Sequence, residues 1–156
     1  MLFRSFQEDD LFRNLSYTQK LPTDLVQCEL KFKSPMVLAG MPYFVEAFRY
    51  LGANLNLDIK AWEGRELNEN SSPLVFELPF NQAILGERIA LNLLTKATSI
   101  ATFTNFFVKR AQDFNIAILD TRKTTPGLRT LEKYAVLVGG GSNHRLGQSE
   151  DRKSVV

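Results

Sequence analysis

The sequence contains a single cysteine, Cys28, and a single histidine, His144. One cysteine cannot form an internal disulfide, and we interpret Cys28 as a structural thiol in a reducing compartment. No segment is long and uncharged enough to suggest a membrane span. The first ten residues turn acidic at Glu8 before an apolar run develops, so we expect no signal peptide. The expected location is the cytoplasm.

The excess of basic residues is small, with a formal net charge of +2. That charge is too low to indicate nucleic acid or an anionic membrane as a partner. Residues 121–145 nevertheless hold five basic side chains and one acidic one, with His144 alongside. Such a local positive field favours a small, multiply charged anion, although a solvated basic face is an open alternative. The five are Arg122, Lys123, Arg129, Lys133 and Arg145.

The first half of the chain has patterns of both strands and helices. Hydrophobic residues make up 44% of the 156 residues, enough for one ordinary core. Between residues 24 and 32 the sequence alternates, which predicts a strand whose even-numbered residues face inward. The other predicted elements are a helix over 4–20, a short strand over 36–39, a helix over 42–51, an alternating segment over 55–62 and a strand over 74–78.

The second half begins with a stretch, 81–114, that lacks proline and has Gly86 as its one glycine. Its apolar spacing predicts one long helix or two joined helices. A short apolar run over 116–119 then ends on polar residues, which is typical of a parallel strand in a β/α barrel. Pro126 and Gly127 begin the next predicted helix, and three glycines end it. We therefore predict an α+β domain followed by the start of an α/β one.

Basic residues follow this strand and also lie one β/α unit later. Arg122 and Lys123 should therefore share one mouth of the barrel with His144 and Arg145. Guanidinium groups bind carboxylates and phosphates through paired hydrogen bonds, and lysine adds a point charge. A substrate with two carboxylates and a phosphorylated co-substrate would suit this cluster. The alternative left open is that both arginines cap helix or sheet ends and that the histidine is a packed residue.

Five segments carry a resemblance to a known family: GERIALNLL (86–94), IAT (100–102), DTRKTTPGLR (120–129), EKYAV (132–136) and GGGSNHRLG (139–147). In order and spacing they resemble the signature segments of quinolinate phosphoribosyltransferase. The resemblance is closest over 84–147 and looser before that, where Val37–Gly40 is similar to a family strand. It departs from the family at Thr98–Ser99, where the family usually has Ser-Gly, and again after Gly147.

The resemblance implies a type II phosphoribosyltransferase fold. Residues 1–80 would form an α+β N-terminal sandwich domain, 81–114 a connecting helical segment, and 115–147 the first β/α units of an incomplete α/β barrel. The implied reaction converts quinolinate and phosphoribosyl pyrophosphate to nicotinate mononucleotide, pyrophosphate and carbon dioxide. It belongs to NAD biosynthesis. We expect the chain to be a fragment of that enzyme and inactive as it stands.

The resemblance also implies roles for individual side chains. Arg122 and Arg145 would pair with the two carboxylates of quinolinate. Lys123, with Thr121, would hold phosphoribosyl pyrophosphate or the carboxylate beside it, and His144 would donate a hydrogen bond. These residues are substrate-binding, and none is assigned a catalytic role.

Arg88 would reach into the active site of a partner subunit, because family members are dimers with shared sites. Taken without the family, Arg88 is an exposed helical residue. Mg²⁺ would bridge the pyrophosphate and needs acidic ligands. The family's acidic ligands would lie after residue 147, so we assign no metal ligand within this chain.

The last nine residues, 148–156, are predicted to be an aberrant tail. From about Asp151 they read as one frame of a common sequencing adapter. Two other functions stay open. One is the molybdenum-transport-associated paralogue of the same fold, whose sequence differs from this one at Thr-Pro-Gly-Leu-Arg and Asn-His-Arg. The other is a non-catalytic anion-binding or dimerisation module.

Overall fold

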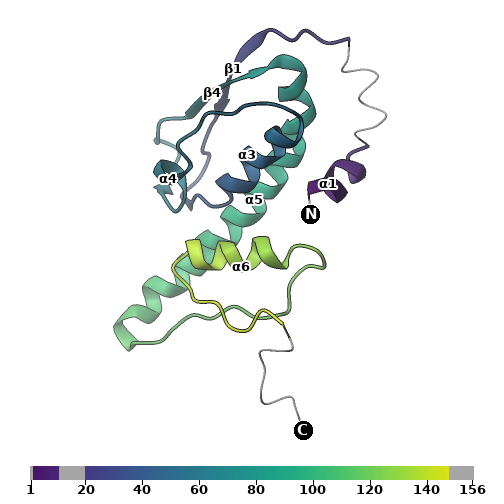
Figure 1. Cartoon of the computed structure of the whole chain (residues 1–156). Helices are drawn as coiled ribbons and strands as arrows, with labels where there is room; N and C mark the ends of the chain where they lie inside the picture. Colours follow the sequence, from purple (N-terminus) through teal and green to yellow (C-terminus); the bar gives the residue numbers. More distant parts are fainter. Residues whose placement is uncertain (1, 11–19, 148–156) are drawn as a thin grey trace.

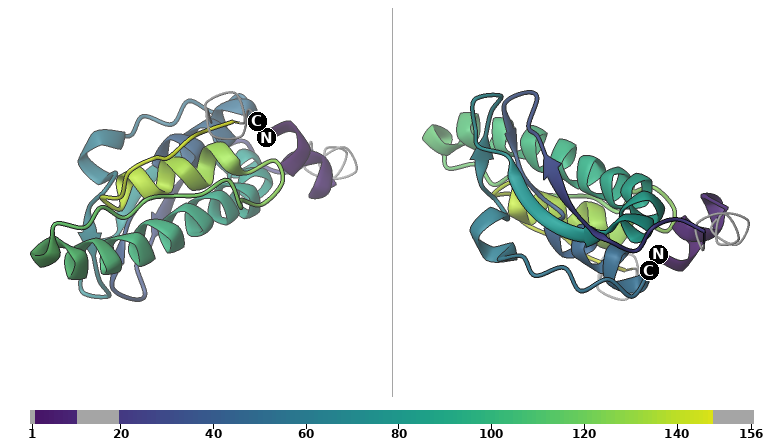
Figure 2. Two further views of the ribbon diagram at one scale, coloured as in Figure 1. Left: turned by 90° about the horizontal axis from the view of Figure 1, so that it is seen from below. Right: turned by 90° about the horizontal axis from the view of Figure 1, so that it is seen from above.

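The computed structural model describes residues 2–10 and 20–147, and the predicted tail lies outside them. Two helices, α3 and α5, lie beneath a two-stranded sheet, and α6 packs on the opposite side of α5 (Figures 1 and 2). The elements in chain order are α1 (Leu2–Glu8), β1 (Leu25–Leu30), β2 (Met36–Val37), α3 (Met41–Tyr50), α4 (Ile59–Trp62), β3 (Glu66–Leu67), β4 (Leu74–Pro79), α5 (Phe80–Ala111), the 3₁₀ turn η1 (Gln112–Phe114) and α6 (Arg129–Val138).

Two small antiparallel sheets form the first half. β1 pairs with β4 from Leu25 opposite Pro79 to Leu30 opposite Leu74, and β2 pairs with β3. Along β1 the even-numbered residues are half-buried and the odd-numbered ones exposed, which confirms the predicted alternation. From β4, Phe76 packs edge-on against Phe44 of α3, with ring centroids 5.7 Å apart. The sheet is therefore held on the helices by aromatic contacts.

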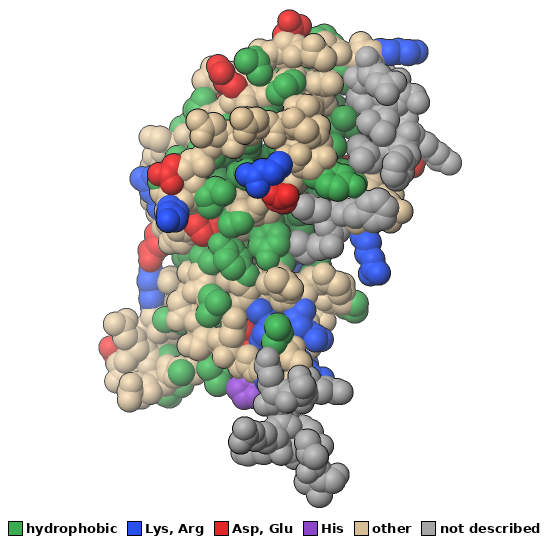
Figure 3. Space-filling view, viewed as in Figure 1, with side chains coloured by type: hydrophobic (Ala, Val, Ile, Leu, Met, Phe, Trp, Pro, Cys, Tyr) green, Lys and Arg blue, Asp and Glu red, His purple; other side chains and the backbone are tan. Residues whose placement is uncertain are grey.

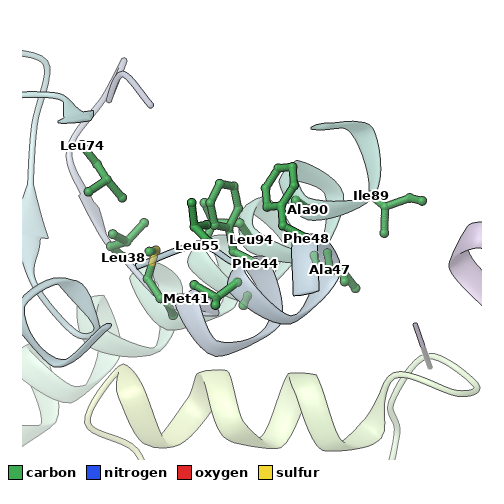
Figure 4. Packing of buried hydrophobic residues seen from close by; sticks show 14 of the residues in the cluster. Leu38, Met41, Phe44, Ala47, Phe48, Leu55, Leu74, Ile89, Ala90 and Leu94 are labelled. Atoms are coloured by element: carbon green, nitrogen blue, oxygen red, sulfur yellow. The ribbon is translucent and has the colours of Figure 1, made fainter. Parts of the chain in front are cut away.

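The core lies between α3 and α5. Met41, Phe44 and Phe48 project from α3 towards Ala90 and Leu94 of α5 (Figure 4), and all five are buried. Truncation of a buried phenylalanine such as Phe44 costs about 3–5 kcal/mol, because the cavity does not fully close.

A glycine allows the two helices to approach closely at the start of α3. Gly40 has φ +101°, a value that side-chain-bearing residues rarely adopt. A Cβ at this position would lie 2.8 Å from the Cβ of Ala97 on α5. Glycine is therefore required here both by its backbone angle and by its contact.

Two threonine side chains of α5 form hydrogen bonds with the backbone around β2. Thr98 Oγ1 accepts a hydrogen bond from the Ala39 amide (3.2 Å) and donates one to the Ala39 carbonyl (3.1 Å). Thr102 Oγ1 accepts from the Val37 amide at 2.9 Å. These hydroxyls satisfy backbone groups that a two-residue strand would otherwise leave unpaired.

The helix α6 packs closely on α5. Leu131 and Ala135 are fully buried, and at the end of α6 the backbone of Gly139 contacts the Ala101 carbonyl of α5. A Cβ at Gly139 would lie 2.5 Å from that oxygen. The glycine after α6 thus sets the distance between these two helices.

The long helix over 81–114 is confirmed as α5 with η1, but the alternating segment over 55–62 was wrongly interpreted. Its second half is the helix α4, because the Asp58 carboxylate accepts hydrogen bonds from the amides of Lys60 (3.1 Å) and Ala61 (3.3 Å). The helix predicted over 4–20 ends at Glu8, and residues 11–19 lie outside the described part.

The predicted strand over 116–119 is reduced to one parallel bridge between Leu119 and Ser142. Within the described residues, the segments around Leu119 and Ser142 pair only with each other. Their pairing does not extend beyond this single bridge. The helix predicted to begin at Pro126 begins at Arg129 instead, because residues 125–128 form a turn closed by the Leu128 amide on the Thr125 carbonyl (3.0 Å). Among the described residues, no helix is long and apolar enough to cross a membrane.

Candidate anion-binding site

The candidate site is formed where the two extended segments flanking α6 lie side by side. The Ser142 amide donates to the Ile118 carbonyl (2.9 Å), and the Asp120 amide donates to the Ser142 carbonyl (3.1 Å). These bonds hold residues 118–120 beside Ser142, so residues 121–123 and 144–145 continue from two neighbouring segments. We call residues 121–123 and 144–145 the basic site.

Asp120 and Lys133 form a buried ion pair at the base of this site. Their side chains are 4% and 3% exposed. The same Asp120 oxygen, Oδ1, accepts a hydrogen bond from the His144 amide at 2.9 Å, and Lys133 Nζ donates to the His144 carbonyl at 3.4 Å. The pair therefore holds the backbone of His144 from both sides.

Asn143 completes this network. In the orientation that satisfies its hydrogen bonds, the side-chain amide nitrogen donates to the Lys133 carbonyl (3.0 Å) and to Asp120 Oδ2 (2.5 Å). Both oxygens of the Asp120 carboxylate are thus occupied by donors from the protein. Asp120 consequently does not present a bare carboxylate to the basic residues above it.

Arg122 is half-buried, and its Nε atom is buried without a hydrogen-bond partner among the described residues. Buried polar groups almost always have a partner, so this N–H requires an acceptor. The Thr121 hydroxyl accepts from the Lys123 amide (3.1 Å) in a local turn and is not a partner of this N–H group. The Lys123 side chain is exposed.

A further basic residue, Arg129, connects the two segments of the site. Its Nε donates to the hydroxyl of Thr124 (3.1 Å), and its Nη1 donates to the Leu146 carbonyl (3.5 Å). His144 is exposed and Arg145 is half-buried. Figure 3 shows Lys and Arg side chains gathered in the lower part of the molecule, with the single histidine close to them.

Arg88 lies apart from the basic site. It projects from α5 into a hollow of about 470 Å³ between α1, α5 and the start of α6. Asn92, Lys96 and Leu131 also line this hollow, whereas none of residues 121–123 or 144–145 does. The structure therefore does not bring Arg88 together with the other predicted substrate-binding residues of its own chain.

Acidic side chains near the basic site are already paired. Asp120 binds Lys133, and Glu132 lies 3.2 Å from Lys96 of α5. No group of three or more His, Cys, Asp or Glu side chains within residues 2–10 and 20–147 could hold a metal ion. Within these residues the two carboxylates nearest the basic site are thus held by lysine side chains.

The charge count over residues 121–145 included Lys133 in the local positive field, and it gave Asp120 no role. The structure corrects both points, because the two side chains neutralise each other in the interior. Leu131 and Lys133 point about 200° apart on α6 and are both buried, so this helix is covered on two sides. A lysine buried in this way needs an acidic partner.

Comparison with known proteins identifies the family. The family model for the N-terminal domain of quinolinate phosphoribosyl transferase matches residues 15–98, and the model for its C-terminal domain matches residues 100–151. The chain belongs to the quinolinate phosphoribosyl transferase family.

Relatives of known name agree with this assignment. A probable nicotinate-nucleotide pyrophosphorylase (carboxylating) of Synechocystis sp. is 40% identical over 111 residues, which are 71% of this chain and 38% of that protein. The nicotinate-nucleotide pyrophosphorylase (carboxylating) of Homo sapiens is 38% identical over 121 residues, which are 76% of this chain and 40% of that protein. The chain thus spans about 40% of the length of these quinolinate phosphoribosyl transferase relatives.

Solved structures show the same fold. The crystal structure of NadC from Streptococcus pyogenes aligns with a TM-score of 0.84 and 32% identity, over 95% of this chain and 54% of that one. Nicotinate-nucleotide pyrophosphorylase from Ehrlichia chaffeensis aligns with a TM-score of 0.80 and 28% identity, over 92% and 53%. The predicted fold class, an α+β domain followed by the first β/α units of a quinolinate phosphoribosyl transferase, is confirmed.

Proposed function

We propose that this chain supplies the N-terminal domain and part of the substrate site of an enzyme that makes nicotinate mononucleotide from quinolinate and phosphoribosyl pyrophosphate. Pyrophosphate and carbon dioxide would be the other products, and the cytoplasm would be the compartment. The relatives named nicotinate-nucleotide pyrophosphorylase (carboxylating) support this proposal.

The observation that carries the proposal is the unpaired Nε of Arg122. It lies on a segment held beside His144 and Arg145, and its acceptor is not among the described residues. A planar dicarboxylate such as quinolinate offers acceptors that match guanidinium groups in pairs. Arg122 and Arg145 would bind one carboxylate each, and His144 would donate a further hydrogen bond.

Positive charge would serve both substrates. Lys123 is exposed beside Arg122 and would hold the phosphoribosyl pyrophosphate or the neighbouring carboxylate, whereas the Thr121 hydroxyl, bound to the Lys123 amide, would shape that turn. Holding two anions together raises their effective concentration, and fixed cations stabilise the departing pyrophosphate. Mg²⁺ would accompany the pyrophosphate, with ligands supplied from outside the described residues.

The test uses the protein expressed from the intact gene, read past Gly147. With quinolinate, phosphoribosyl pyrophosphate and Mg²⁺ it should release nicotinate mononucleotide and carbon dioxide. Arg122→Ala should lower kcat/KM by about 100-fold or more, because misplaced substrate carboxylates lose their alignment. Arg122→Lys should not restore it, since lysine cannot form the paired hydrogen bonds.

Arg49, exposed on α3 and paired with Glu46, provides the control, and Arg49→Ala should keep full turnover. A folded protein that neither binds quinolinate nor releases product would overturn the proposal. Such a result would favour the anion-binding module or the molybdenum-transport-associated paralogue.

We further propose that Arg88 acts in the site of a partner subunit in a homodimer. The hollow that it lines contains none of the basic-site residues of its own chain. Mixing Arg88→Ala and Arg122→Ala proteins should restore turnover, because a hybrid dimer has one site without either change. Mixing Arg122→Ala with Arg145→Ala should restore none, since both residues serve the same site. Absence of rescue in the first mixture, after confirmed subunit exchange, would place Arg88 outside the shared site.

A further inference from the structure

An acidic side chain lies at the base of a site that is otherwise basic. Asp120 directly precedes Thr121 and Arg122, where an unpaired carboxylate would repel an anionic substrate. Its side chain is 4% exposed and is directed at Lys133 instead. A carboxylate at this position cannot attract an anionic ligand, so its presence needs another explanation.

Stability alone is a poor explanation for the pair. Removing two charges from water costs several kcal/mol per ion, and the attraction between them roughly offsets that cost. Replacement of a buried pair by apolar residues is often neutral or stabilising, whereas loss of one partner is strongly destabilising. The contacts of the pair with a third residue are more informative.

Both members of the pair bind the main chain of His144. Asp120 Oδ1 accepts from its amide (2.9 Å), and Lys133 Nζ donates to its carbonyl (3.4 Å). The peptide units on either side of His144 are thus fixed relative to Asp120, which directly precedes Thr121. The two halves of the basic site, which lie more than twenty residues apart in sequence, are joined at this point.

We infer that the Lys133–Asp120 pair positions the anion site: it fixes His144 and Arg145 relative to Arg122 and keeps the Asp120 charge away from the ligand. Neither residue touches the substrate. The inference rests on the proposed function, because the ligand that it positions for is quinolinate. Precise placement matters for such a site, since a shift of about 1 Å can cost about 100-fold in rate.

The test compares three changes in the protein expressed from the intact gene, with quinolinate as the calorimetric probe. Lys133→Met leaves a buried, unpaired Asp120 and should lower both the unfolding temperature and the affinity. Asp120→Leu/Lys133→Met removes both charges, so the unfolding temperature should recover. Its affinity for quinolinate should remain about tenfold or more below wild type, as for other losses of groups that orient ligand-binding residues.

The double variant separates positioning from stability. If its affinity recovers together with its unfolding temperature, the pair is merely structural and the inference is overturned. Lys109→Met/Glu66→Gln removes an exposed ion pair (2.7 Å) at the far end of α5 and should change neither quantity. If wild-type protein fails to bind quinolinate, the proposed function has failed instead, and the inference falls with it.

A milder variant keeps the inference testable if the double variant does not fold. Asn143 is exposed, and its amide contacts the pair from outside through the Lys133 carbonyl and Asp120 Oδ2. Asn143→Ala removes both of these hydrogen bonds but leaves the ion pair in place, so it should lower the unfolding temperature less than Lys133→Met does and weaken quinolinate binding about threefold to tenfold. Unchanged affinity in this variant would also overturn the inference.

Discussion

Lys96 Nζ lies 3.2 Å from Glu132 Oε1, which joins the middle of α5 to the first turn of α6. Glu132 also accepts a hydrogen bond from the Thr125 amide at 3.4 Å, in the turn that leads into α6. Burial alone raises the pKa of Glu132, but the hydrogen bonds from Thr125 and Lys96 and the charge of Lys96 outweigh it, so the pKa lies below its usual value. Ionisation of Glu132 therefore stabilises the folded state.

This depressed pKa predicts how stability depends on pH. A group whose pKa is lower in the folded state stabilises the protein above its unfolded pKa, and the contribution disappears as the pH falls through the folded value. The difference in unfolding free energy between wild type and Glu132→Gln should therefore be largest near neutral pH and shrink on acidification. Urea denaturation at a series of pH values measures it. A difference that stays constant down to about pH 3 would contradict the assignment.

The carboxylate of Glu63 should be needed at the start of α3. Its two oxygens accept hydrogen bonds from the amides of Gly40 (2.7 Å) and Met41 (2.8 Å). Glu63→Gln replaces one acceptor by a donor that faces an N–H group, which should cost about 1–3 kcal/mol of unfolding free energy. Glu66→Gln, in an exposed pair with Lys109, should change it by no more than about 1 kcal/mol. Equal effects of the two changes would count against a capping role.

The hydroxyl of Thr98 should contribute more than that of Thr95 on the same helix. Thr98→Val leaves both the amide and the carbonyl of Ala39 without their partner in the interior, at a cost of about 1–3 kcal/mol for a buried unsatisfied group. Thr95 is exposed, and its hydroxyl donates to the Leu91 carbonyl of its own helix (2.7 Å), so Thr95→Val should cost little. The denaturation midpoints of the two variants test this prediction. Similar midpoints would show that the hydrogen bonds between Thr98 and Ala39 do not stabilise the fold.

A methyl group at Gly139 should force α6 away from α5. It would lie 2.5 Å from the Ala101 carbonyl, and such overpacking typically costs about 1–3 kcal/mol. Gly127 has φ +81° with open space around it, so Gly127→Ala carries only the backbone penalty of about 1 kcal/mol. Thermal unfolding should rank Gly139→Ala as the less stable variant. The reverse order would mean that the contact between helices can relax.

Regular, half-buried elements were predictable from the sequence. The alternation over 24–32 and the helical spacing over 81–114 are repeated along many residues, so β1 and α5 follow from pattern alone. The structure of segment 55–62 was not predictable from the pattern. Its alternating apolar residues match a strand, whereas the Asp58 carboxylate caps a short helix. A local hydrogen bond decided that structure against the wider pattern.

The sequence predicted which segments form the site, but it did not predict the buried contacts beneath them. The strand-end argument predicted that residues 121–123 and 144–145 share one end of neighbouring strands, and the structure joins the residues before them, Leu119 and Ser142, in a parallel bridge. It could not reveal the Asp120–Lys133 pair, since a count of charges along the chain does not distinguish a buried lysine from an exposed one. The roles assigned to the site residues and the domain division at residues 80 and 114 stay predictions.

The threonine hydroxyls of α5 have a consequence for amide hydrogen exchange. The amides of Val37 and Ala39 lie around a two-residue strand, where fraying would normally make exchange fast. Their acceptors are side chains of a long helix, so these protons become accessible only when α5 and the β2 region separate. Slow exchange at Val37 and Ala39, on the timescale of the α5 amides, would show that a helix and a strand far apart in sequence open as one unit.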